Sequence, residues 1–139
     1  MSTPNPLFPV LVVDDNIDDL FVLRQRLLRT GIPNPIVTFE DGAEAMAHLK
    51  RVLGGENEPV PVIMFLDLRM PKCGGFEVLK WVRMQPGLSP MPVVIVSNSP
   101  LPENAARAKQ LGASRFVAKF PSPDALADMV ADASAERTG

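Results

Sequence analysis

The fold is indicated most clearly by one short stretch, Val62-Ile63-Met64-Phe65-Leu66-Asp67, in which five apolar residues in a row end on an aspartate. No polar residue alternates with the apolar ones. A strand of this composition is buried on both faces, which is typical of a parallel sheet that helices cover on both sides. The stretch therefore predicts a central strand with an acidic side chain at its carboxyl end.

Two further apolar runs share this character. Val10–Val13 precedes Asp14 and Asp15, and Val93–Val96 precedes Ser97. Because each run is short and bounded by polar residues, each is expected to be a buried strand with a polar side chain at its end. Two shorter strands are expected at Ile36–Phe39 and Phe116–Ala118.

Helical patterns separate the expected strands. Asn16 can cap the first helix, and Asp41 with Glu44 forms a capping-box pattern at the start of the second. The only histidine, His48, is expected on the solvent side of this second helix. The residues expected on the buried side of the first helix are Ile17, Leu20, Phe21, Leu27 and Leu28. Five strand–helix units with right-handed crossovers predict a doubly wound α/β domain, with a five-stranded parallel sheet of flavodoxin-like order 2-1-3-4-5 and helices on both faces.

This strand order predicts where the polar strand ends meet. Strands 1 and 3 lie side by side, so Asp14, Asp15 and Asp67 are expected in one crevice beyond the carboxyl ends of the strands. Ser97 and Lys119 follow the next two strands and point to the same edge. Close carboxylates repel one another unless positive charge lies between them. Lys119 supplies part of that charge, and we expect a divalent cation, Mg²⁺ with Mn²⁺ as an alternative, to supply the rest.

Composition limits the classes of function. A chain of 139 residues suits one domain, which we expect at 9–133 between short tails at 1–8 and 134–139. The net charge of −2 and the pI of about 5.4 give no basic surface for nucleic acid. No apolar run approaches the length of a membrane span. The single cysteine, Cys73, cannot form an internal disulfide, which suits a cytoplasmic location.

Four segments carry a more specific indication when they are taken together and in order. They are LVVDDN at 11–16, LDLRMP at 66–71 with Gly74-Gly75, VIVS at 94–97 and GASRFVAK at 112–119. With them the chain resembles the receiver domain of response regulators, of the chemotaxis-regulator type, from about Pro9 to Val130. The acidic segment Asp14–Asp19 and the long loop before the third strand also resemble the stand-alone regulators of bacterial phytochrome-type histidine kinases.

The resemblance implies that Asp67 accepts a phosphoryl group from a sensor histidine kinase or a phosphotransfer protein. It also implies that Asp14 and Asp15 hold Mg²⁺ beside Asp67 and that the main-chain carbonyl of Arg69 completes the protein ligands. The chain would then be a single-domain response regulator and not an enzyme, since it would catalyse only its own phosphorylation and dephosphorylation.

Three further residues would respond to phosphorylation. The resemblance implies that Ser97 binds a phosphoryl oxygen, that Lys119 pairs with the phosphoryl group, and that the ring of Phe116 turns inward as an aromatic switch. Few residues follow the last expected helix, so output is expected through another protein. The switched surface would bind a downstream target or a second copy of the chain.

Other functions fit parts of the sequence. The main alternative is a receiver-like interaction module that works without phosphorylation, but such a module would normally lack one of the acids or the lysine. A metal-dependent phosphohydrolase with an aspartyl nucleophile would need a second aspartate two residues later, where this chain has Arg69. A flavin carrier on the same fold is disfavoured because the acidic segment Asp14–Asp19 would repel the phosphate.

The sequence departs from the family pattern at one position. Proline usually follows the lysine, with a cis peptide bond that helps to aim the amine, but here Phe120 follows Lys119 and Pro121 comes one place later. Either the Lys119–Phe120 bond stays cis, or the loop forms with trans bonds or with the kink moved to Phe120–Pro121. We expect the cis form, because the kink serves to place the amine.

Overall fold

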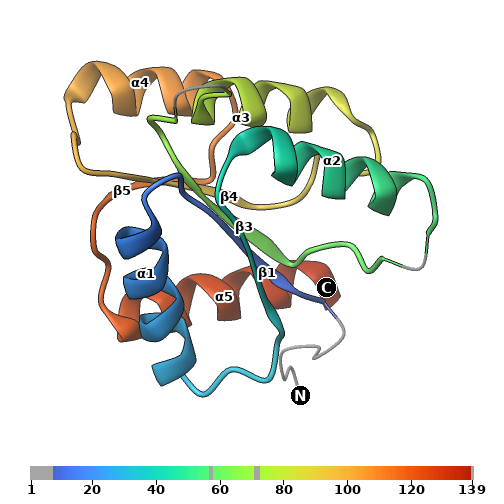
Figure 1. The fold of residues 1–139 in the computed structure, drawn as a ribbon, viewed down its shortest axis with the longest axis horizontal. Helices are drawn as coiled ribbons and strands as arrows, with labels where there is room; N and C mark the ends of the chain where they lie inside the picture. The colour runs from blue at the N-terminus through green and yellow to red at the C-terminus, as the bar shows by residue number, and fades with distance from the viewer. Residues whose placement is uncertain (1–7, 57, 71–72, 139) are drawn as a thin grey trace.

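The computed structural model describes residues 8–56, 58–70 and 73–138, in which five strands alternate with five helices (Figure 1). The strands are β1 (Val10–Val13), β2 (Ile36–Phe39), β3 (Ile63–Asp67), β4 (Val93–Ser97) and β5 (Arg115–Ala118). The helices are α1 (Ile17–Arg29), α2 (Gly42–Leu53), α3 (Gly75–Met84), α4 (Pro102–Gln110) and α5 (Pro123–Thr138). Every expected strand is therefore present.

The strands form one parallel sheet in the order β2-β1-β3-β4-β5, which confirms the predicted doubly wound arrangement. In the register of the central pair, Val13 at the end of β1 lies opposite Leu66. Asp67 is the last residue of β3, and Asp14 is the first residue beyond β1. The pairing therefore brings these two carboxylates to the same edge of the sheet.

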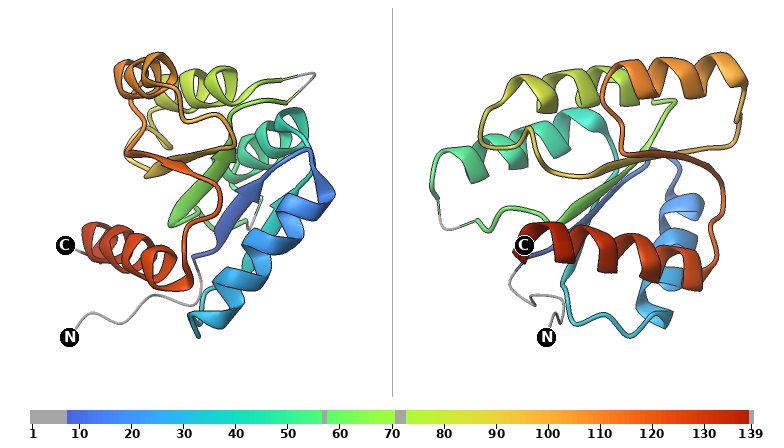
Figure 2. Two further views of the ribbon diagram at one scale, coloured as in Figure 1. Left: turned by 90° about the vertical axis from the view of Figure 1, so that its left-hand side faces the viewer. Right: turned by 180° about the vertical axis from the view of Figure 1, so that it is seen from behind.

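Helices cover both faces of the sheet: α1 and α5 lie on one side, and α2, α3 and α4 lie on the other (Figure 2). Successive residues of the central strand enter opposite cores. Met64 and Leu66 pack in the core under α2 and α3, and Phe65 packs with α1 and α5. All residues of β1, β3 and β4 are buried, as their composition predicted.

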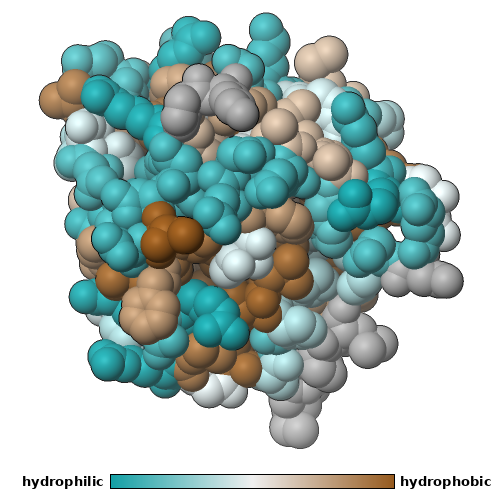
Figure 3. Space-filling view, in the orientation of Figure 1, coloured by the Kyte–Doolittle hydropathy of each residue, from teal (hydrophilic) through white to brown (hydrophobic). Residues whose placement is uncertain are grey.

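Helix α1 begins as predicted, but its buried side differs from the prediction. The Asn16 side chain accepts hydrogen bonds from the N–H groups of Asp18 and Asp19 and so caps the helix. The buried residues are Leu20, Leu23 and Leu27. The prediction was wrong for Ile17, Phe21 and Leu28, which are 61%, 61% and 48% exposed. These three lie about 100° around the helix from the buried stripe, and apolar atoms accordingly appear on the surface over α1 (Figure 3).

The prediction that His48 is solvated was also wrong. Its side chain is buried, and its ring centre lies 5.1 Å from that of Phe39 on β2. Burial lowers the pKa of His48, so that the neutral imidazole is favoured at this position. The cap of the same helix is as predicted, since Asp41 Oδ1 accepts the Glu44 N–H at 2.7 Å.

The ends and one loop complete the description. Residues 1–7 of the expected N-terminal tail lie outside the described residues. Helix α5 runs through the expected boundary at 133 to Thr138, so that boundary stays a prediction. The Lys119–Phe120 bond is cis, as expected. Within the described part of the chain, no helix combines the length and the apolar character needed to cross a bilayer.

Candidate functional site

The polar residues at the strand ends meet in one crevice with a volume of about 280 Å³. Its lining residues are Asp14, Asp15, Asn16, Asp19, Asp67, Arg69, Ser97, Asn98, Ser99 and Lys119. Every residue expected at the site is present except Phe116, which lies elsewhere on β5. The predicted convergence beyond the carboxyl ends of the strands is therefore observed.

The close approach of α3 fixes the backbone beside Asp67. A Cβ atom at Gly75 would collide with the carbonyl oxygen of Asp67, and the Gly75 N–H donates to the Leu68 carbonyl at 3.0 Å. Because a larger residue would push the helix away from the strand, Gly75 lets α3 begin directly against the end of β3.

The Lys119 amine lies at the centre of the crevice, and its side chain is only 2% exposed. The distances from Nζ are 2.6 Å to Asp14 Oδ2, 2.9 Å to Asp19 Oδ2 and 3.0 Å to Asp67 Oδ1. Three carboxylates thus share one ammonium group. Loss of the ammonium group would leave these buried carboxylates uncompensated, which is strongly destabilising.

Burial and charge act against each other here. Burial raises the pKa of Asp67 to about 6, although the bond to Lys119 favours the ionised form. Burial also raises the pKa of Asp14, and bonds from Lys119 and the Asn16 N–H oppose that change. Burial alone would lower the pKa of Lys119, but its bonds to the carboxylates raise it. The amine is therefore protonated at neutral pH, and the carboxylates carry more charge than it balances.

This surplus negative charge suits a cation. Asp14, Asp15 and Asp67 each offer one carboxylate oxygen, and these oxygens all lie within 4.8 Å of one another. Asp14 and Asp67 are buried and Asp15 is exposed, so that the group opens to solvent on one side. Mg²⁺ takes a few carboxylate oxygens and keeps several waters. The residues therefore fit a divalent cation, and Arg69 lines the same crevice.

The two predicted switch residues lie on neighbouring strands. Ser97 ends β4 with 2% of its surface exposed, and its Oγ accepts the Ser99 N–H at 2.9 Å. Phe116 on β5 is half-buried and lies opposite Ile95 of β4. It lines a separate hollow with residues of α4. The paired strands β4 and β5 thus connect Ser97 with Phe116.

The sequence reasoning missed the contact of Asp19 with Lys119. From the sequence, Asp19 was considered only as part of the acidic segment Asp14–Asp19. The two residues are 100 positions apart, and no local spacing links them. The signal that could have found it is the predicted neighbourhood of the start of the first helix and the end of the fifth strand.

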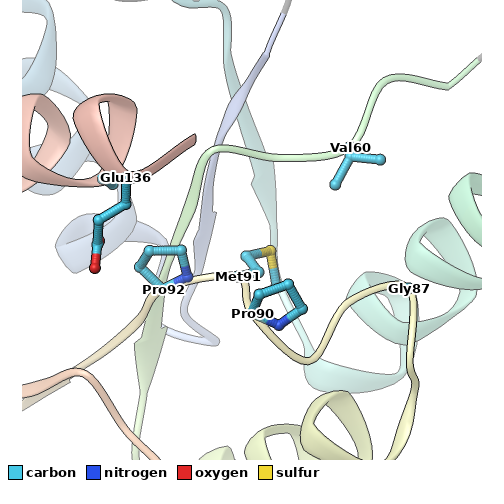
Figure 4. A pocket seen from close by; sticks show the side chains of 7 residues that line it. Val60, Gly87, Pro90, Met91, Pro92 and Glu136 are labelled. Atoms are coloured by element: carbon cyan, nitrogen blue, oxygen red, sulfur yellow. The ribbon is translucent and has the colours of Figure 1, made fainter. Parts of the chain in front are cut away.

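A second hollow, of about 510 Å³, lies at the opposite edge of the sheet, where β3 and β4 begin (Figure 4). Its lining includes Val60, Pro90, Met91 and Pro92, and among the described residues that line it only Glu136 is ionisable. Catalytic sites bring several polar groups together. This hollow does not, so the chemistry is assigned to the acidic crevice.

Residues 10–131 match the family described as the response regulator receiver domain. The chain belongs to this family. Pro71, part of one motif that carries the resemblance, lies outside the described residues. The matched range contains all five strands of the sheet and the residues that line the acidic crevice.

Three response regulators are similar to this chain in sequence and in structure. Response regulator Rcp1 of Synechocystis sp. is 30% identical over 126 residues, covering 91% of this chain and 86% of Rcp1. The Mn²⁺-bound structure of Rcp1 has a TM-score of 0.73 at 29% identity, covering 90% of each chain. The structure of the phosphorylated cyanobacterial phytochrome response regulator RcpA has a TM-score of 0.74 at 30% identity, covering 90% of this chain and 89% of RcpA. The structure of the bacteriophytochrome response regulator AtBRR has a TM-score of 0.78 at 29% identity, covering 93% of this chain and 95% of AtBRR.

Proposed function

We propose that this receiver domain accepts a phosphoryl group on Asp67 from a sensor histidine kinase or a phosphotransfer protein and then changes a protein-binding surface. The observation that carries the proposal is the position of the Lys119 amine, 3.0 Å from Asp67 and 2.6 Å from Asp14. It provides a fixed positive charge beside the carboxylate that would carry the phosphoryl group. Phosphoryl transfer depends mainly on such positioning and electrostatic stabilisation.

Asp67 is suited to act as the nucleophile. With a pKa of about 6, its carboxylate is mostly ionised at neutral pH. A carboxylate oxygen attacks phosphorus and forms a new O–P bond, while the bond from phosphorus to the imidazole nitrogen of the donor breaks and leaves its electron pair on that nitrogen. Lys119 then pairs with the phosphoryl oxygens, and the hydroxyl of Ser97 donates to one of them.

The acidic group has a second role in this proposal. Asp14, Asp15 and Asp67 would hold Mg²⁺, with the main-chain carbonyl of Arg69 as a further ligand. Such a cation, when bound, would offset the charge of the carboxylates and of the phosphoryl group. The Mn²⁺-bound structure of Rcp1 supports a divalent cation in this family, and Mn²⁺ would be an alternative here.

The output is proposed to pass through β5. A shift of Ser97 toward a phosphoryl group would disturb β4, whose Ile95 lies opposite Phe116. The ring of Phe116 would then change the surface between β5 and α4, where a downstream protein or a second copy of the chain would bind. The relatives that are phytochrome response regulators support a bacterial phytochrome-type kinase as the upstream partner.

Intact mass spectrometry with acetyl phosphate tests the proposal. With Mg²⁺ the wild-type chain should gain the mass of one phosphoryl group, and chelation of Mg²⁺ should prevent the gain. Asp67→Asn should gain nothing, whereas Asp128→Asn, which changes an exposed aspartate on α5, should behave as wild type. Equal labelling of Asp67→Asn and wild type would refute the assignment, and an unlabelled wild type would favour an interaction module that works without phosphorylation.

A further inference from the structure

Asp19 has two polar contacts that the proposed chemistry does not use. It lies in the first turn of α1, and its side chain is 19% exposed. Its Oδ2 atom lies 2.9 Å from Lys119 Nζ and accepts a hydrogen bond from Asn98 Nδ2 at 3.4 Å. One carboxylate oxygen therefore contacts both the lysine of the crevice and the loop directly after β4.

Asp19 differs from the other two partners of Lys119. Asp14 and Asp67 belong to the group of carboxylates that could hold a cation, and Asp19 does not. Positive charge bound by that group would weaken the hold of Asp14 and Asp67 on the amine, because the same carboxylates would serve both. Asp19 would keep its full charge for Lys119. A phosphoryl group on Asp67 must therefore compete with Asp19 for the amine.

The backbone that carries Lys119 does not depend on Asp19 for its position. Arg26, one turn from the end of α1, donates from Nη1 to the carbonyl oxygens of Phe120 at 3.5 Å and Pro121 at 3.1 Å. Its guanidinium carbon lies 5.8 Å from the centre of the Phe120 ring. These contacts hold the loop that follows Lys119. Neutralising Asp19 would thus leave the amine beside Asp14 and Asp67.

We propose that Asp19 is a positioning residue that holds the Lys119 amine before phosphorylation and competes with the phosphoryl group for it. The inference rests on the proposed function of Asp67. Removing the charge of Asp19 frees the amine for an anionic phosphodonor, and it also makes the crevice less attractive to a cation. The two effects have opposite signs, whereas a general loosening of the site would weaken the binding of both.

Kinetics with acetyl phosphate test this competition at saturating Mg²⁺. Asp19→Asn should lower the KM for acetyl phosphate about fivefold with kcat within about twofold of wild type, and calorimetry should show about threefold weaker Mg²⁺ binding. Asp18→Asn is the matched control, because Asp18 is its exposed neighbour and does not line the crevice. Asp18→Asn should change neither quantity by more than about twofold, and Asp19→Glu should restore the wild-type values.

Three results would overturn the inference. One is an unchanged KM in Asp19→Asn, or the same fall in KM in Asp18→Asn, while wild type is still phosphorylated. Another is a fall in kcat at unchanged KM, which would mean that Asp19 aims the amine productively. If wild type takes up no phosphoryl group at all, the proposed function fails and this inference fails with it. Only the first two results leave the proposed function intact.

Discussion

The Asp67 carboxylate should destabilise the cation-free fold at neutral pH, and Asp67→Asn should therefore raise the free energy of unfolding. Burial raises the pKa of Asp67 from 3.8 to about 6, so that ionising this carboxyl costs about 3 kcal/mol more in the folded chain than in the unfolded chain. Asparagine resembles that uncharged form in size and shape. The substitution should thus gain up to about 3 kcal/mol at pH 7 when no cation is bound.

The sign of the pH dependence follows from the same pKa. Between about pH 4 and pH 6 the folded chain holds a proton on Asp67 that the unfolded chain has released. The contribution of Asp67 to the free energy of unfolding therefore falls through this range as the pH rises. Below it both states are protonated, and the difference between wild type and Asp67→Asn should be small.

Urea unfolding in the presence of a chelator measures this difference at several pH values. The advantage of Asp67→Asn over wild type should grow from near zero at pH 4 to about 3 kcal/mol at pH 7. Asp128→Asn, an exposed change on α5, should stay within about 0.5 kcal/mol of wild type. If Asp67→Asn is no more stable than wild type at pH 7, the attraction of Lys119 fully offsets burial, and the reasoning is wrong.

Three more predictions concern the same crevice. Mg²⁺ at a hundredfold excess over its Kd should stabilise wild type by about 2.7 kcal/mol in thermal melts. Asp15→Asn should lose this response, and in chelator it should melt at a higher temperature than wild type. If Mg²⁺ does not change the melting temperature of wild type, the crevice is not a cation site. Lys119→Ala should destabilise the cation-free chain by about 3–5 kcal/mol in urea, because it leaves buried carboxylates unpaired, and a loss below about 1 kcal/mol would mean that water compensates them. Beryllofluoride with Mg²⁺ should change the sedimentation coefficient or the affinity for a kinase or target in wild type and not in Phe116→Ala, and equal values with and without beryllofluoride would argue against a switched surface.

The sheet and its site could be predicted because burial on both faces leaves a plain pattern. β1, β3 and β4 are continuous apolar runs, and a polar residue either ends the strand or follows it directly. Once the order of the strands follows from the crossovers, the positions of Asp14, Asp67 and Lys119 at one edge follow as well. The chemistry therefore depended on strand ends, which are the easiest positions to locate in such a sequence.

The contacts of α1 could not be predicted in the same way. The helix carries apolar residues on two stripes, and only packing against the sheet and α5 decides that Leu23 is buried and Phe21 is exposed. The contacts of Asp19 with Lys119 and of Arg26 with Pro121 join residues 100 and 95 positions apart. Both require the relative position of a helix and a distant loop, which no pattern along the chain specifies.

The location of the phosphoryl group tests the assignment of Asp67 most directly. An aspartyl phosphate is an acyl phosphate, so hydroxylamine should release the phosphoryl group and leave a hydroxamate on the residue that carried it. After incubation with acetyl phosphate and Mg²⁺ and then treatment with hydroxylamine, peptide mass spectrometry should find the hydroxamate at Asp67 alone. A hydroxamate at Asp14 or Asp15, or a phosphoryl group that survives hydroxylamine as an ester on Ser97, would contradict the assignment.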